Sequence, residues 1–133
     1  MSSLKSSQLS PGSIGENWSW VSPILLELGG GLDPLHVRRE VEEGKAWFLL
    51  GQGQEFVILK GARRQYSEEP YLLVWFGWSK SGNAIERYWS DIQQIGRDAD
   101  FKFIEFWSDR TGFSRIAEKM GLKPDMTIYR GEI

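Results

Sequence analysis

The chain contains no cysteine and a single histidine, His36, among its 133 residues. Without a thiol, a thiolate nucleophile, a disulfide framework and a cysteine-based metal site are excluded. One histidine also excludes a site with several histidine ligands, so we expect no bound metal. The charged residues around His36 place it on a solvated helix face, which disfavours a histidine-based catalytic triad.

Long apolar runs and an excess of one charge are missing as well. No stretch reaches the ~20 apolar residues needed to cross a bilayer. The first residues lack the basic-then-apolar order of a secretory signal. A formal net charge of −2 gives no basic footprint for nucleic acid or for an anionic membrane. We therefore expect a cytoplasmic protein that binds neither.

What the chain does have is aromatic side chains, including seven tryptophans. Such side chains fill either a core or a partner interface. Residues 1–16 are rich in serine and glycine and carry few large apolar side chains, which predicts a flexible or extended arm. Residues 17–133 are then predicted to form a single domain.

The centre of this domain is predicted at residues 70–107. An apolar run at residues 71–76 leads through Gly77 and Trp78 into a loop at residues 79–82. An amphipathic segment at residues 83–95 and a second apolar run at residues 101–107 follow. This order is typical of a βαβ unit whose first strand is buried on both faces. The loop at the start of the helix is where such a unit holds an anion, because free backbone N–H groups point there.

Further elements are predicted on both sides of this unit. Ser22 and Asp33 each precede a proline, a signal for two helix starts, and Gly44 ends the second helix. Residues 46–50 and 55–60 are predicted as a hairpin, residues 113–120 as a helix and residues 126–133 as a last strand. The charged residues of the second helix, Glu40 among them, and the basic residues from Lys60 to Arg64 are expected to be solvated.

From Asp33 onward, this order of elements resembles the GNAT acetyltransferase superfamily. Residues 116–124, Ile-Ala-Glu-Lys-Met-Gly-Leu-Lys-Pro, are similar to the last helix of that family and the turn after it. The resemblance implies a mixed α+β fold, with a central, mostly antiparallel sheet, a βαβ crossover and flanking helices. It also implies that acetyl-CoA lies where the central strand splays from the next strand.

The family holds the coenzyme pyrophosphate in a loop of the form Gln/Arg-x-x-Gly-x-Gly/Ala. Residues 79–84 align with it: Gly82 and Ala84 match, Ser79 departs from the pattern, and Lys80 supplies a positive charge. The resemblance thus implies that the coenzyme-binding residues are Phe76, Trp78, Lys80, Gly82, Asn83 and Ala84.

The resemblance leaves the catalytic groups open. Ala117 stands where the family often has a tyrosine that protonates the leaving thiolate, and Arg110 stands where it often has an asparagine. Tyr129 and Tyr88 are the alternative proton donors. The candidate bases are Glu105, Asp109 and Glu55, and the favoured catalytic pair is Glu105 and Tyr129.

Two functions from different classes follow. In the first, a GNAT-like domain with a degenerate site is a binding or structural module, similar to small phage proteins associated with virions or host interference. Its partner is an unknown protein or a second copy of itself, and it is virion-associated if a phage encodes it. The departures at Ser79 and Ala117 favour this hypothesis. In the alternative, the chain is an acetyl-CoA-dependent N-acetyltransferase, because positioning and backbone polarisation supply much of the rate. An unrelated mixed α/β interaction domain is a third hypothesis.

Overall fold

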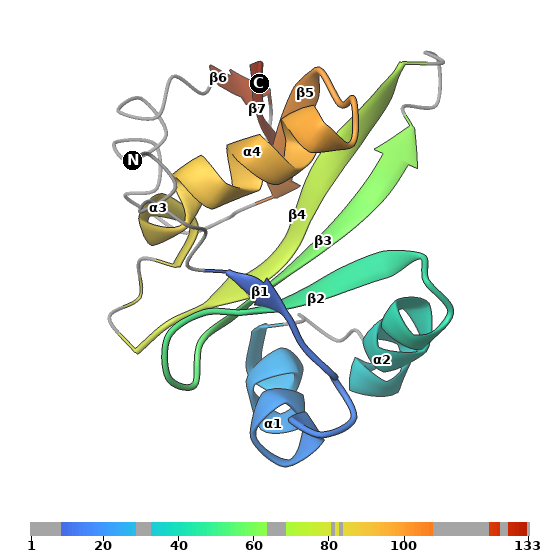
Figure 1. Cartoon of the computed structure of the whole chain (residues 1–133), viewed down its shortest axis with the longest axis vertical. Helices are drawn as coiled ribbons and strands as arrows, with labels where there is room; N and C mark the ends of the chain where they lie inside the picture. Colours follow the sequence, from blue (N-terminus) through green and yellow to red (C-terminus); the bar gives the residue numbers. More distant parts are fainter. Residues whose placement is uncertain are drawn as a thin grey trace.

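The computed structural model describes residues 9–28, 33–63, 69–80, 82, 84–107, 123–125 and 128–132. Within these residues, seven strands form one sheet with the order β1-β2-β3-β4-β5-β7-β6 (Figure 1). Only the β4–β5 pair is parallel, and the other neighbouring strands are antiparallel. The strands are β1 (Ser10–Pro11), β2 (Ala46–Leu50), β3 (Phe56–Arg63), β4 (Pro70–Trp78), β5 (Phe103–Trp107), β6 (Lys123–Asp125) and β7 (Ile128–Glu132).

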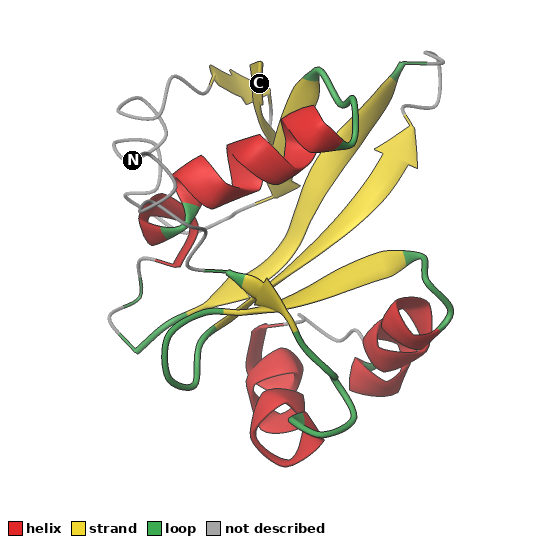
Figure 2. Ribbon diagram, viewed as in Figure 1, coloured by secondary structure: helices red, strands yellow, loops and turns green. Residues whose placement is uncertain are grey.

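Two groups of helices lie on opposite sides of the strands (Figure 2). α1 (Trp18–Leu28) and α2 (Pro34–Glu42) precede β2 in the chain. α3 (Ala84–Arg87) and α4 (Trp89–Asp98) connect β4 to β5 and form the helical part of the crossover. The predicted fold class is therefore confirmed: a mixed α+β chain with a mostly antiparallel sheet, one βαβ crossover and flanking helices.

Local signals set the elements of the first half. Asp33 caps α2, because its carboxylate accepts a hydrogen bond of 3.0 Å from the Leu35 amide, and Pro34 takes the first helical position. Gly44 follows α2 with φ +78°, a conformation that suits glycine. β2 has the predicted bounds, and β3 continues three residues beyond the predicted Lys60.

Two features near the N-terminus differ from the prediction. α1 begins at Trp18 rather than at Ser22, and Pro23 lies inside it. Residues 1–8 of the predicted arm lie outside the described residues, but Ser10 pairs with Leu50 of β2, and Leu9 and Ile14 are buried. This part of the predicted arm therefore pairs and packs with the sheet. Leu9 and Ile14 are isolated apolar residues with no periodicity, so the sequence did not indicate that they are buried.

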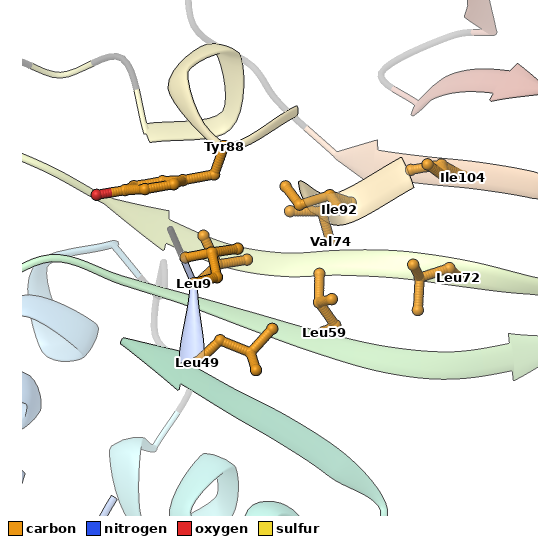
Figure 3. Close-up of a cluster of buried hydrophobic side chains, with 9 residues drawn as sticks. Leu9, Leu49, Leu59, Leu72, Val74, Tyr88, Ile92 and Ile104 are labelled. Atoms are coloured by element: carbon orange, nitrogen blue, oxygen red, sulfur yellow. The ribbon is translucent and has the colours of Figure 1, made fainter. Parts of the chain in front are cut away.

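The core consists of two hydrophobic clusters, one on each face of the sheet. We call them the α4-side cluster and the α1/α2-side cluster. Figure 3 shows the first, in which Tyr88 and Ile92 from the helical segment lie over strand residues. Burying one such side chain stabilises the fold by about 1.5–3 kcal/mol. The α4-side cluster comprises Leu9, Leu49, Val57, Leu59, Leu72, Val74, Tyr88, Ile92 and Ile104, and the α1/α2-side cluster comprises Ile14, Val21, Leu25, Val37, Ala46, Phe48, Phe56 and Ile58.

Candidate functional site

β4 changes the direction of its side chains at Trp75. Ile58 of β3 pairs with Phe76, whereas the next residue, Leu59, pairs with Val74, so Trp75 is an extra residue in β4. Val74 accordingly belongs to the α4-side cluster, while both Trp75 and Phe76 pack against the α1/α2-side cluster. Such β-bulges bend a strand and redirect its side chains, and they are common next to active sites.

The pairing between β4 and β5 stops at the same point. Three pairs join these strands, and the last is Val74 with Phe106. β4 continues to Trp78 and stays paired with β3, but residues 75–78 have no strand partner on the β5 side within the described part of the chain. An unpaired strand edge offers backbone groups to an extended ligand. We call residues 75–78 on this side the open edge of β4.

The predicted pyrophosphate loop lies at the end of this open edge. Ser79 is buried, Lys80 is exposed, and Gly82 adopts φ +77° in a turn in which its amide donates to the Ser79 carbonyl over 3.0 Å. A Cβ atom at Gly82 would meet no atom within 4 Å, so the space beside it is open. Ala84, which is buried, then begins α3. Open edge and glycine turn are thus consecutive along the chain.

A polar group surrounds Trp75 on the α1/α2 side. Lys60 Nζ lies 2.6 Å from Glu40 Oε1 and 4.6 Å from the centroid of the Trp75 ring, and the His36 ring lies edge-on to Trp75 at 6.0 Å. We call these four residues the Glu40 cluster. The hydrogen bond from Lys60 lowers the pKa of Glu40, burial opposes this effect, and the charges of Lys60, Lys45 and His36 add to the lowering.

The solvated positions predicted for Glu40 and Lys60 are therefore wrong. Glu40 is 9% exposed, and Lys60 extends from β3 across the sheet face toward α2. His36, in contrast, is exposed as predicted. The spacing of His36 and Glu40, four residues apart on α2, was the available signal, because such residues share a helix face.

A second polar group lies on the α4 side, next to α3. The Tyr88 hydroxyl donates to Glu55 Oε1 and accepts a hydrogen bond of 3.1 Å from the Gln52 amide. Arg87 Nη1 lies 3.0 Å from the second oxygen of Glu55. We call these four residues the Tyr88 network. In Figure 3 the Tyr88 ring lies over the strands, with its oxygen pointing away from the rest of the hydrophobic cluster.

Sequence reasoning named Tyr88 as a proton donor and Glu55 as a base, each without a partner. The structure joins them to each other instead. Burial and the hydrogen bond to Glu55 raise the pKa of Tyr88 above its ordinary value, so the phenol keeps its proton. With Tyr88 1% exposed and Glu55 7% exposed, both groups are enclosed and mutually satisfied. This arrangement suits holding elements together rather than moving a proton.

Comparison with known proteins supports the fold. No family model matches the chain, and no curated protein matches it in sequence. Solved structures do match. A GNAT-family acetyltransferase from Listeria monocytogenes has a TM-score of 0.64 at 9% identity, with 94% of each chain covered. The fold is that of the GNAT acetyltransferases.

Two other structures with the GNAT fold match the chain. A Drosophila melanogaster polyamine N-acetyltransferase, which catalyses the formation of N-acetylagmatine, has a TM-score of 0.63 at 12% identity, covering 94% of this chain and 99% of that one. AtaTR bound with acetyl-CoA has a TM-score of 0.53 at 8% identity, with 73% of each chain covered.

The residues predicted from the GNAT resemblance fall into three groups. Gly82, Lys80 and Ala84 lie at the end of the open edge, and Asn83 lies outside the described residues. Phe76 and Trp78 pack against the α1/α2-side cluster. Their role in coenzyme binding stays a prediction.

The predicted catalytic residues lie on β5 and β7. Glu105 is 2% exposed and pairs with Leu73, one step before the pairing ends. Its neighbour Ile104 faces the α4 side, so strand alternation places Glu105 on the α1/α2 face, which is also the face of Trp75. The backbone of Tyr129 pairs with Phe106, but its side chain lies outside what the structure describes, as do Asp109, Arg110 and Ala117.

Within the described residues, no group of three or more potential ligands could hold a metal ion. None of the helices seen in that part of the chain has the length and hydrophobicity to span a membrane.

Proposed function

We propose that this chain binds acetyl-CoA along the open edge of β4 and transfers its acetyl group to an amine. The observation that carries the proposal is the end of β4–β5 pairing after Val74 and Phe106, immediately before the bulge at Trp75. An opening that begins at a bulge and ends at a glycine turn matches the coenzyme site that the GNAT fold implies. A structural neighbour with acetyl-CoA bound adds support.

The direction of the bound coenzyme follows from the two ends of this edge. With the pyrophosphate at the Gly82 turn, the pantetheine arm runs back along residues 75–78 and hydrogen-bonds their backbone as an added strand would. The thioester then lies near Trp75, where the opening starts. Backbone N–H groups there would polarise the thioester carbonyl in a fixed geometry.

The acceptor amine would approach from the α1/α2 face. The Glu40 cluster, which includes Trp75, lies on this face, and so does Glu105, which pairs with Leu73. The amine nitrogen attacks the thioester carbon, the carbon–sulfur bond breaks, and CoA leaves as the thiol after taking up a proton. Glu105 is the residue we propose to accept the proton from the amine, because it is a carboxylate on this face one step before the end of the β4–β5 pairing.

Calorimetric titration with acetyl-CoA tests the proposal. Gly82→Phe places a bulky side chain in the open space beside the turn, and Gly44→Phe is its matched control. Both glycines have nearly the same φ, +77° and +78°, and neither has an atom within 4 Å of an added Cβ. The backbone strain is thus equal and only the location differs.

We expect micromolar binding by the natural chain and by Gly44→Phe, and a loss of at least about tenfold in affinity for Gly82→Phe. No heat at millimolar acetyl-CoA with the natural chain would contradict the proposal. Equal losses of affinity in the two variants would show that the coenzyme does not bind at the Gly82 turn.

A second proposal is that the GNAT fold is retained here as a binding or structural module. Ala117, at the position of the family's usual acid, favours it. So do three large apolar side chains that face solvent: Leu26, 67% exposed, Leu35, 53%, and Trp47, 41%. A role in a phage particle or in host interference, with a protein partner or a second copy, belongs to this proposal. If the chain releases free CoA from acetyl-CoA when a panel of amines is added, this second proposal is excluded and the transferase proposal holds.

A further inference from the structure

The Tyr88 network and the β3–β4 pairing beside it hold the two ends of the Gly82 turn. At its first end, Trp78 pairs with Phe56, the first residue of β3. At its second end, α3 leads into Tyr88, whose hydroxyl donates to Glu55, the residue directly before Phe56. Two consecutive residues, Glu55 and Phe56, therefore anchor the strand before the loop and the helix after it.

Helical hydrogen bonds connect Tyr88 to Ala84, the first residue of α3. The Tyr88 amide donates to the Ala84 carbonyl over 3.0 Å, and the Ile92 amide donates to the Tyr88 carbonyl over 2.9 Å. Tyr88 itself has φ −102° and ψ 14°, so the helix is interrupted where its side chain turns to Glu55. Because Ala84 is only one turn away, a displacement of Tyr88 would shift the start of α3 and the end of the loop.

The β2–β3 hairpin leaves space for the Tyr88 side chain at Gly51. A Cβ atom at Gly51 would lie 2.2 Å from the Tyr88 hydroxyl oxygen, so only glycine leaves room for it. The Gly51 amide donates to the Glu55 carbonyl over 2.9 Å, which closes the hairpin around the network. Arg87 contacts both carboxylate oxygens of Glu55, at 3.0 and 3.3 Å. Each polar atom of the Tyr88–Glu55 pair thus has a fixed partner.

We propose that Tyr88 and Glu55 are positioning residues for the pyrophosphate of the coenzyme. They act through the start of α3 at Ala84, which they fix beside the Gly82 turn that meets the ligand. This inference rests on the proposed function, and it adds residues that do not touch the coenzyme. Preorganisation of this kind raises affinity by removing the cost of ordering the loop on binding.

The test compares two ligands that share the thioester arm. S-acetylpantetheine lacks the pyrophosphate and the adenosine of acetyl-CoA, so a loop defect should weaken only acetyl-CoA. Tyr88→Phe removes the hydroxyl of the network. Tyr71→Phe is the matched control, because it removes a tyrosine hydroxyl at the other end of β4, from a side chain that is also buried.

We expect Tyr88→Phe to lower the affinity for acetyl-CoA about tenfold and to leave S-acetylpantetheine unchanged. Tyr71→Phe should change neither. Equal losses for both ligands, or no loss, would overturn the inference. If the natural chain binds no acetyl-CoA, the proposed function fails as well, whereas binding without the ligand difference overturns only the positioning role.

A second measurement covers the case in which S-acetylpantetheine binds too weakly to measure. Amide hydrogen exchange of residues 79–84 is recorded without ligand. We expect faster exchange of these amides in Tyr88→Phe and in the milder Glu55→Gln, and natural rates in Tyr71→Phe. Natural rates in all three variants would overturn the inference, even if Tyr88→Phe proves less stable overall.

Discussion

Besides Glu105, two buried glutamates lie on opposite sides of the sheet, and they have different surroundings. Glu40, on the α1/α2 side, pairs with Lys60, whose side chain is 27% exposed and also contacts Trp75. Glu55, on the α4 side, pairs with Tyr88, which is 1% exposed, and with Arg87. The first carboxylate is bound by two lysines whose side chains are both partly exposed, whereas the second is bound by a fully buried phenol as well as by the 38% exposed Arg87.

Under the proposed function, this difference would assign the two tasks of a transferase to the two sides of the sheet. The side beside the bulge, with Trp75, Lys60 and His36, presents charged and aromatic groups toward the place where an acceptor would arrive. The other side, with Glu55 and Tyr88, fixes the loop that would hold the coenzyme. A group that is enclosed and fully hydrogen-bonded is well suited to positioning, because its geometry does not change with solvent.

The largest expected effect comes from truncating the two glutamates. Glu55→Ala leaves the buried phenol of Tyr88 without its acceptor, while the 38% exposed Arg87 can turn to water, so we expect a loss of about 3 kcal/mol in unfolding free energy. Glu40→Ala should cost clearly less, because Lys60 and the 60% exposed Lys45 can turn to water. Urea unfolding of the two variants measures the difference, and equal losses would contradict the contrast between the two sides.

A smaller effect is expected from the hairpin glycines. Gly51→Ala drives a Cβ atom to 2.2 Å from the Tyr88 oxygen, so we expect a loss of about 2 kcal/mol. Gly53→Ala should cost about 1 kcal/mol, because Gly53 has φ +66° but an added Cβ has no atom within 4 Å. In a Tyr88→Phe background the cost of Gly51→Ala should fall, since the closest atom is gone. An unchanged cost there would show that the Tyr88 hydroxyl is not what limits the space at Gly51, because the ring carbon Cζ, 2.5 Å from an added Cβ, remains in Tyr88→Phe.

The smallest effects are expected from pH, and they have opposite signs on the two sides. The pKa of Glu40 is lowered from 4.5, so its contribution is present above that pH and is lost as the pH falls through the folded value. The pKa of Tyr88 is raised from 10.0, so its contribution is present below that pH and is lost as the pH rises through the folded value.

Unfolding free energies across the pH range would reveal these signs. The difference between the natural chain and Glu40→Gln should shrink below about pH 4.5, and the difference from Tyr88→Phe should shrink above about pH 10. Lys45 also has a raised pKa, but it is present in both the natural chain and Tyr88→Phe. Its effect on the unfolding free energy therefore cancels when these two proteins are compared. Differences that do not depend on pH would contradict the assigned pairs.

The elements with local signals were predictable from the sequence. Asp33 and Pro34 mark the start of α2, and a continuous apolar run that ends before Gly51 gives β2 its bounds. The crossover from β4 to β5 follows from an amphipathic segment between two apolar runs. These signals depend on neighbours along the chain, so one sequence is enough to read them.

The features that define the site depend on contacts between distant residues. The bulge at Trp75 is hidden in an unbroken apolar run, because each face of β4 is buried and no polar residue marks the shift of register. Glu55 and Tyr88 are 33 residues apart, and Glu40 and Lys60 are 20 apart. Each looks like an ordinary surface charge or a core aromatic until the sheet brings the partners together.

The position of the coenzyme is the central claim, and backbone amide shifts would test it most directly. Acetyl-CoA is titrated into isotopically labelled protein and the amide resonances are followed by NMR. The account predicts the largest shifts along residues 75–78 and at Gly82, with small shifts on the buried pairs between β2 and β3. Shifts confined to α1 and α2, or none at saturating coenzyme, would contradict it.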